Sequence, residues 1–233
     1  MAEITTVPFG PQHPVLPEPI HLDLELKDEK VVRAVPSIGY VHRGLEKLVE
    51  KRDFKQFIYV AERVCGICSF GHGWGYAKAV EGLMNIEIPE RASCLRTLWH
   101  ELSRLHSHLL WFGLAADAIR EMVLDIFEET TGGRVIFSVC KIGGVRRDIT
   151  DSQRKMILEK MKELKKEISQ MAMVFLYDNT IQSRLEGVGV LSMNDAMDMG
   201  CVGPMARASG LPVDYRMAED EGFYKKLHFH PVT

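Results

Sequence analysis

The sequence predicts a mainly α-helical fold of the α+β kind, in which a bundle of long helices follows a small N-terminal β-hairpin. Apolar residues recur three and four positions apart through most of residues 41–180, as they do on the buried face of a helix. Residues 20–35 instead alternate between apolar and polar side chains, which is typical of strands. With 46% apolar and 26% charged residues, the chain can bury a core of its own.

The hairpin is expected to begin near residue 20. Four apolar residues alternate with polar ones in its first strand: Ile20, Leu22, Leu24 and Leu26. A turn over residues 27–30 and an apolar run over residues 31–35 complete it. Five prolines precede it, at positions 8, 11, 14, 17 and 19, and each removes a backbone donor. Residues 8–19 are therefore expected to form a fixed, extended loop.

Three helical stretches are predicted behind the hairpin. The helical period holds over residues 45–61, so this stretch should end just before a CxxC motif. A long helix should begin at Pro89, because proline is favoured in the first turn, and should end before Gly132. Another should begin at Thr150, where Thr150 and Gln153 form a capping box.

One domain is expected over residues 1–233. Its parts are an N-terminal loop and hairpin (1–40), a helical core (41–180) and a loop-rich segment (181–233). Beyond Gly187 we expect exposed apolar surface, and we expect Arg207, Asp214 and Arg216 to form an architectural charge network.

Composition narrows the possible functions. The formal net charge is −3 and no basic block occurs, so nucleic acid is not an expected partner. The sequence has no run of about 20 apolar residues and no N-terminal leader pattern, so we expect a cytoplasmic chain. Five cysteines, two of them in a CxxC, favour metal or redox chemistry over a set of structural disulfides.

The strongest local motif is the segment 63–72, which reads RVCGICSFGH and contains Cys65, Cys68 and His72. A structural zinc site would require four ligands, and the remaining cysteines are not paired at a readable spacing. A thioredoxin-like thiol pair would follow a strand, whereas a helical pattern precedes this one. The third interpretation is a bimetallic redox site that takes two thiolates here, with His72 hydrogen-bonding to a thiolate.

Five segments in this order resemble one family, the large subunit of energy-converting nickel-iron hydrogenases, which is related to the quinone-site subunit of respiratory complex I. They are residues 10–14 (GPQHP), 38–47 (IGYVHRGLEK), 63–72 (RVCGICSFGH), 101–110 (ELSRLHSHLL) and 203–210 (GPMARASG). The resemblance covers nearly the whole chain and implies a hydrogenase-large-subunit-like fold. Complex I subunits of this kind lack the metal thiolates, so Cys65 and Cys68 place the resemblance on the hydrogenase side.

The resemblance also implies roles for individual residues. Cys65 would be a terminal nickel ligand, and Cys68 would bridge nickel to an iron that carries diatomic ligands. His72 would act beside them. Glu18, at the end of the proline loop, would relay protons, because dihydrogen oxidation releases protons to a nearby base.

The implied activity is reversible dihydrogen oxidation, with electrons passed to a small iron-sulfur subunit and coupling to membrane-arm subunits. The complex would lie at the inner face of the cell membrane. Because the family closes its metal site with a second CxxC, and none follows Cys68 here, we expect a fragment that is inactive alone and whose nickel-iron centre is absent or incomplete. The alternatives are a complex-I-like or sulfur-reducing relative, and a non-catalytic assembly fragment.

Overall fold

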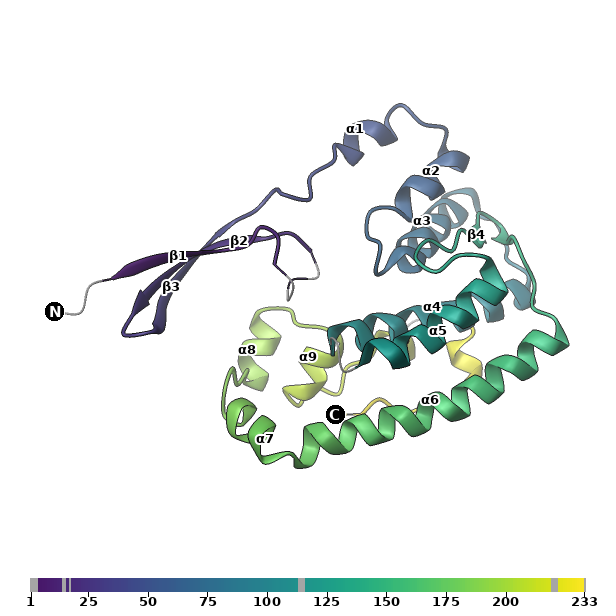
Figure 1. Cartoon of the computed structure of the whole chain (residues 1–233). Helices are drawn as coiled ribbons and strands as arrows, with labels where there is room; N and C mark the ends of the chain where they lie inside the picture. Colours follow the sequence, from purple (N-terminus) through teal and green to yellow (C-terminus); the bar gives the residue numbers. More distant parts are fainter. Residues whose placement is uncertain (1–3, 14–15, 17, 113–115, 219–221, 233) are drawn as a thin grey trace. The chain divides into compact units, whose positions relative to one another are not determined.

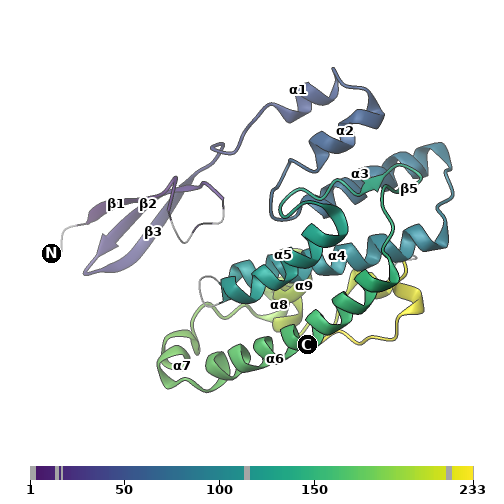
Figure 2. The same cartoon turned by 45° about the vertical axis from the view of Figure 1, so that its right-hand side comes forward.

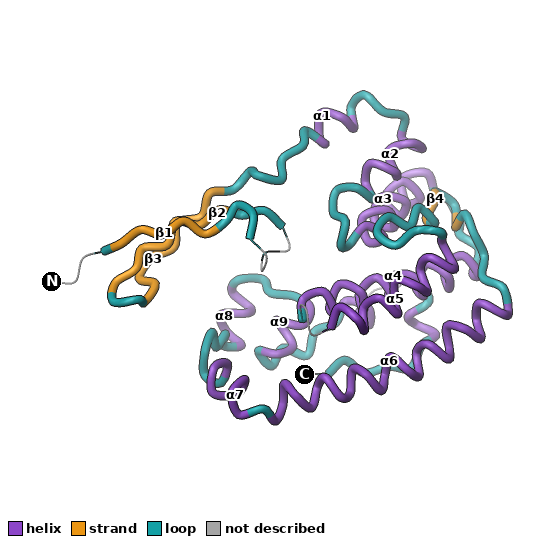
Figure 3. Tube along the Cα trace, viewed as in Figure 1, coloured by secondary structure: helices purple, strands orange, loops and turns teal. Residues whose placement is uncertain are grey.

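The computed structural model describes residues 4–13, 16, 18–112, 116–218 and 222–232. Its internal contacts divide the chain into two units, residues 1–60 and residues 61–233, each of which is described by itself. The expectation of a single domain stays a prediction. Helices dominate and strands gather in the first unit, so the predicted mainly α fold is confirmed (Figures 1 and 3).

The first unit contains a three-stranded antiparallel sheet in the order β1 (Thr5–Phe9), β2 (His21–Lys27) and β3 (Lys30–Ser37). The β2–β3 hairpin confirms the prediction. Strand β1 was not predicted, because Pro8 argued against regular structure; the strand lies at the sheet edge, where a missing donor is tolerated. Of the predicted extended loop, residues 14, 15 and 17 lie outside the described residues.

Two short helices follow the sheet, α1 (Leu45–Val49) and α2 (Phe54–Ala61). They confirm the helical pattern predicted up to the CxxC motif. Helix α2 ends at the first residue of the second unit, so the cysteines follow directly after it.

Four longer helices form the second unit: α3 (Ser69–Met84), α4 (Glu90–Trp111), α5 (Asp117–Thr131) and α6 (Asp151–Tyr177). Helix α5 packs on both α4 and α6, and α3 packs on α4 (Figures 1 and 2). The single long helix predicted from Pro89 is therefore wrong, because the chain forms two helices there. No helix among the described residues is both long enough and apolar enough to span a bilayer.

The core of the second unit is apolar and aromatic. Phe127 stacks on Phe137 with ring centroids 3.7 Å apart. Other side chains buried almost completely are Phe70, Ala77, Leu95, Trp99, Val123 and Ile126. At the start of α6, the Thr150 hydroxyl accepts from the Gln153 backbone N–H, and Gln153 caps the Thr150 backbone in return, which confirms the predicted capping box.

A buried ion pair joins α3 to α4. Arg96 donates from Nη1 and Nη2 to the two Glu81 carboxylate oxygens, at 2.9 and 2.6 Å. The same guanidinium also donates to the Lys141 and Gly144 carbonyls, and the Gly143 N–H donates to Glu81. These last residues belong to the two-residue strands β4 (Cys140–Lys141) and β5 (Gly144–Val145) and to the turn between them. Every charged hydrogen-bonding group of the pair is therefore engaged inside the protein.

The C-terminal segment contains more helix than predicted. It forms the short helices α7 (Asn179–Leu185), α8 (Met193–Asp198), α9 (Gly203–Ala208) and α10 (Tyr215–Ala218), with a 3₁₀ turn at Tyr224–Lys226. Many of its apolar side chains are exposed, as predicted: Val188, Val190, Met197, Met199, Val202 and Met205. The segment is loop-rich only between these short elements.

The Glu81–Arg96 pair can be tested by Arg96→Met, which keeps most of the side-chain volume and removes the charge. It should lower the free energy of unfolding by about 3–5 kcal/mol, because Glu81 is left charged and unpaired in the interior. Urea unfolding measures this change. Arg91→Met on the same helix, whose partner Asp148 lies at the exposed surface, should change stability little. Equal losses in the two variants would contradict the importance of the buried pair.

Candidate functional site

The cysteine motif lies in the second unit, in the loop between α2 and α3. Helix α2 ends at Ala61, and α3 begins at Ser69 with Cys68 as its N-terminal cap. The Ser69 hydroxyl donates to the Val135 carbonyl at 2.8 Å and anchors the start of α3 to a segment distant in sequence. The positive end of the α3 dipole lies beside Cys68, where it favours a negatively charged thiolate.

Cys65, Cys68 and His72 come together as a group of three possible metal ligands. Their ligand atoms all lie within 4.8 Å of one another. The Cys68 N–H donates to the Cys65 sulfur at 3.3 Å, and the His72 N–H donates to the Cys68 carbonyl at 3.3 Å. Two sulfurs bound at about 2.3 Å to one metal stand less than about 4.6 Å apart, so a small movement of the loop suffices for joint binding.

The donor types suit a soft or borderline transition metal. Two thiolates and an imidazole fit nickel, iron or zinc better than the hard cations that prefer oxygen. Cys65 is half-buried and Cys68 is exposed, so an ion can reach both sulfurs. Among the described residues this is the group of three or more such side chains that meets the distance criterion.

The other three thiols are placed differently. Cys94 and Cys201 are half-buried, and neither belongs to the group around Cys65. Cys140 is buried, and burial raises the pKa of its thiol to about 12, so it stays protonated and is a poor ligand. The donors gathered in the described chain are thus two sulfurs and one ring nitrogen.

Glu18 belongs to the first unit, where its side chain is exposed. Because the two units are described separately, the common cavity expected for Glu18 and the cysteine pair stays a prediction. The proton-relay role of Glu18 also stays a prediction.

Glu62 is a carboxylate that sequence reasoning missed. It is only 1% exposed, three residues before Cys65. Ser138 donates to its Oε2 at 2.8 Å, whereas Oε1 is buried without a partner among the described residues. Gly73 makes room for it, since a Cβ there would lie 2.7 Å from the Glu62 Cγ. Burial raises the pKa of Glu62, and the hydrogen bond from Ser138 and the charge of Arg63 oppose this rise.

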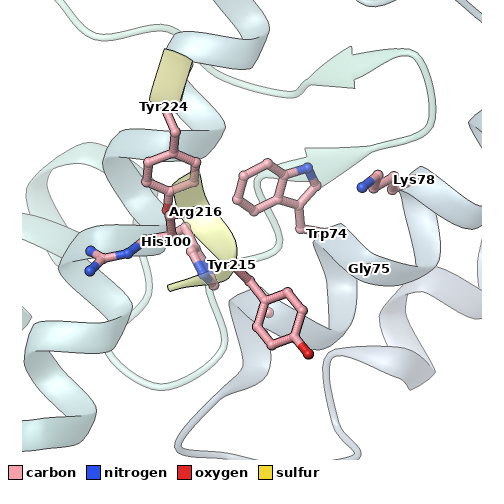
Figure 4. Close-up of a pocket in the computed structure, with 8 residues that line it drawn as sticks. Trp74, Gly75, Lys78, His100, Tyr215, Arg216 and Tyr224 are labelled. Carbon is pink, nitrogen blue, oxygen red and sulfur yellow. The ribbon is translucent and has the colours of Figure 1, made fainter. Parts of the chain in front are cut away.

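A separate pocket of about 250 Å³ lies against α3 and α4. Figure 4 shows the rings of Trp74, Tyr215 and Tyr224 around it, with His100 beside Trp74 at a centroid distance of 5.1 Å. Its guanidinium, from Arg216, is already paired, as described next. None of the three metal-ligand candidates lines this pocket.

The charge network predicted around Asp214 is present at this pocket. Arg216 donates to Asp214 at 2.6 Å and to Glu101 at 3.2 Å, and Arg207 lies 3.4 Å from Asp214. The hydrogen bond from Arg216 is the main reason that the pKa of Asp214 is lowered to about 2. We therefore interpret the network as architectural.

The buried carboxyl of Glu62 leads to a pH-dependent prediction. Its pKa in the folded chain lies above the ordinary 4.5, so the folded state holds this proton more tightly than the unfolded state does. As pH rises above about 4.5, ionisation favours unfolding, and the parent chain loses stability. Glu62→Gln should escape this loss, so its stability relative to the parent should increase from about pH 4 to about pH 7 in urea unfolding. Glu87→Gln, at an exposed position, should show no such trend; a parallel pH response of both variants would contradict the assignment.

Comparison with known proteins relates this geometry to a family. A family model described as nickel-dependent hydrogenase matches residues 43–116, the part that contains the cysteine cluster. A second, described as the 49 kDa subunit of respiratory-chain NADH dehydrogenase, matches residues 112–233, which is more than half of the chain.

Individual relatives cover nearly all of this chain. The membrane-bound hydrogenase subunit alpha of Pyrococcus furiosus is 42% identical, with 97% of this chain and 56% of the relative covered. One of the subunits of the F420H2 dehydrogenase of Methanosarcina mazei is 36% identical (97% and 64%). The corresponding subunit in the NADH-quinone oxidoreductase of a Sulfurovum species is 38% identical (97% and 58%).

A solved structure agrees with these matches. The membrane-bound sulfane sulfur reductase, an archaeal respiratory membrane complex, matches with a TM-score of 0.92 at 32% identity, covering 99% of this chain and 65% of its counterpart. The chain thus spans between about half and two thirds of the length of these relatives. The matches to both halves and the agreement of the fold show that the chain belongs to the oxidoreductase family formed by nickel-iron hydrogenase large subunits and the related complex I subunits.

Proposed function

We propose that this chain contributes Cys65 and Cys68 to the nickel-iron centre of a membrane-bound hydrogenase that interconverts dihydrogen with protons and electrons. The observation that carries the proposal is the convergence of Cys65, Cys68 and His72 within 4.8 Å in a chain of this family. When bound, such a centre supplies the redox chemistry, and the protein supplies its ligands, orientation and proton transfer.

Each residue has a defined task in this proposal. Cys65 and Cys68 hold the metals through their thiolates. His72, one turn into α3, hydrogen-bonds to a thiolate and tunes its basicity. Glu18 accepts and returns the proton. Because the described cluster offers two thiolates and the family site uses four, the isolated chain is expected to hold no stoichiometric nickel.

The partners follow from the relatives. One relative is named a subunit of a membrane-bound hydrogenase, and another comes from a respiratory membrane complex. We propose that this chain likewise joins membrane-arm subunits and a small subunit with an iron-sulfur cluster that receives the electrons. The complex would be peripheral on the inner, cytoplasmic face of the membrane.

A second candidate is reduction of sulfane sulfur on the same scaffold. The match to the sulfane sulfur reductase, with its TM-score of 0.92, favours it. Retention of both cysteines does not separate the two reactions, because a soft metal site can serve either one. Identity to the hydrogenase subunit is higher, at 42% against 32% for the reductase chain, so hydrogen chemistry is the leading proposal.

Cys68→Ser in the assembled complex tests the metal role. The variant should lose bound nickel and dihydrogen uptake, because serine replaces a soft thiolate with a hard, protonated hydroxyl. Elemental analysis for nickel and iron, together with a gas-uptake assay, measures both effects. Cys94→Ser, the same change at a thiol outside the group, should retain both. A parent complex that reduces sulfane sulfur and takes up no dihydrogen would support the second candidate instead.

Glu18→Gln tests the proton relay in the same complex. Nickel content should stay unchanged, while exchange between dihydrogen and deuterated water should fall by about 100-fold or more, because a general acid–base group contributes at least that factor. Glu29→Gln, in the exposed turn between β2 and β3, is the matched control. An exchange rate equal to that of the control would remove Glu18 from the mechanism.

A further inference from the structure

A second buried group lies against the cysteine loop from the α4 side. His106 is only 2% exposed, and its Nε2 accepts a hydrogen bond from the Arg120 Nη2 on α5 at 2.9 Å. A guanidinium only donates, so Nε2 must be the unprotonated ring nitrogen. The neutral ring of His106 therefore carries its hydrogen on Nδ1.

The ring stays neutral under ordinary conditions. Burial, followed by the charge of Arg120, lowers the pKa of His106 to about 4. The backbone of Ile67 acts in the opposite direction, as a carbonyl does when it faces a ring N–H. Ile67 lies between Cys65 and Cys68, so the group that faces His106 is the middle of the cysteine loop.

The Nδ1 donor is not fully used in this structure. It is buried and makes no hydrogen bond of standard geometry within the described part of the chain. A buried donor without a complete partner costs about 1–3 kcal/mol. A small inward movement of the Ile67 carbonyl would remove that cost, and joint binding by both sulfurs requires a small movement of the same loop.

We infer that His106 is a positioning residue for the cysteine loop: its Nδ1–H holds the Ile67 carbonyl and thereby sets the geometry in which Cys65 and Cys68 present their sulfurs to one metal. The inference rests on the proposed metal site. Arg120 fixes the tautomer that makes this hydrogen bond possible. The sulfurs are thus oriented through the backbone between them, from a helix that carries neither cysteine.

Cobalt(II) binding to the 233-residue chain tests this role without any need for catalysis. Thiolate-to-cobalt absorption reports binding at the cysteine pair. His106→Leu should weaken binding about 10- to 100-fold, the range found when a group that orients a metal ligand is removed. His106→Asn places an amide N–H near the position of Nδ1 and should recover much of the affinity.

His108→Leu is the matched control, since it makes the same change two residues along α4 at an exposed side chain. It should bind cobalt(II) like the parent. All titrations are made well below the unfolding temperature of each variant, so that a loss of stability alone does not lower the affinity. If His106→Leu does not fold, His106→Asn and Arg120→Met decide the question, because Arg120→Met releases the tautomer and should also weaken binding.

Two outcomes would contradict these conclusions, and they differ. If the parent binds cobalt(II) and the His106 and Arg120 variants bind it equally well, the positioning role is wrong while the metal site stands. If the parent shows no thiolate-to-cobalt absorption at all, the proposed metal site itself fails, and the inference fails with it.

Discussion

The buried pair between Glu81 and Arg96 is the interaction on which the second unit depends most. It joins α3 to α4 and also holds the β4–β5 turn, because the two side chains share their hydrogen bonds with the Lys141, Gly143 and Gly144 backbone. Burial alone would lower the pKa of Arg96, but the hydrogen bond from Glu81, the nearby Cys140 and the charge of Glu81 raise it, so the guanidinium stays charged. A charge pair satisfied on every side tolerates little displacement of either helix.

This constraint extends to the candidate metal site. Helix α3 begins at the cysteine loop and contributes Glu81 near its other end, so fixing Glu81 fixes the direction in which the loop is presented. Helix α4 supplies Arg96 to the pair and His106 to the loop. Both sides of the loop are therefore held by the same two helices, which is the rigid support that a metal site requires.

The sequence predicted the features that depend on local chemistry. The hairpin, the capping box at Thr150 and the helical pattern before Cys65 rely on residues close together in the chain, and the structure contains all three. Helix α3 was missed because Gly71, Gly73 and Gly75 lower helix propensity, whereas Gly73 is required there by the approach of Glu62. The break between α4 and α5 was missed because the apolar period continues on both sides of it.

The candidate site was predicted only in part, for a related reason. The CxxC spacing and His72 are local, and the structure brings these three residues together. Glu62 and His106 act through partners far away in sequence: Ser138 is 76 residues from Glu62, and Arg120 and Ile67 lie on either side of His106. No periodicity or spacing reports such contacts, so only the folded chain reveals them.

The exposed methionines of the C-terminal segment have a consequence for handling the protein in air. Met197, Met199 and Met205 are more than half exposed on or beside α8 and α9. A thioether in contact with solvent oxidises to the polar sulfoxide, which changes the apolar character of the surface around it. Samples purified aerobically would become heterogeneous in mass and surface polarity, independently of the state of the cysteine pair. Anaerobic preparation therefore preserves this surface as well as the thiols.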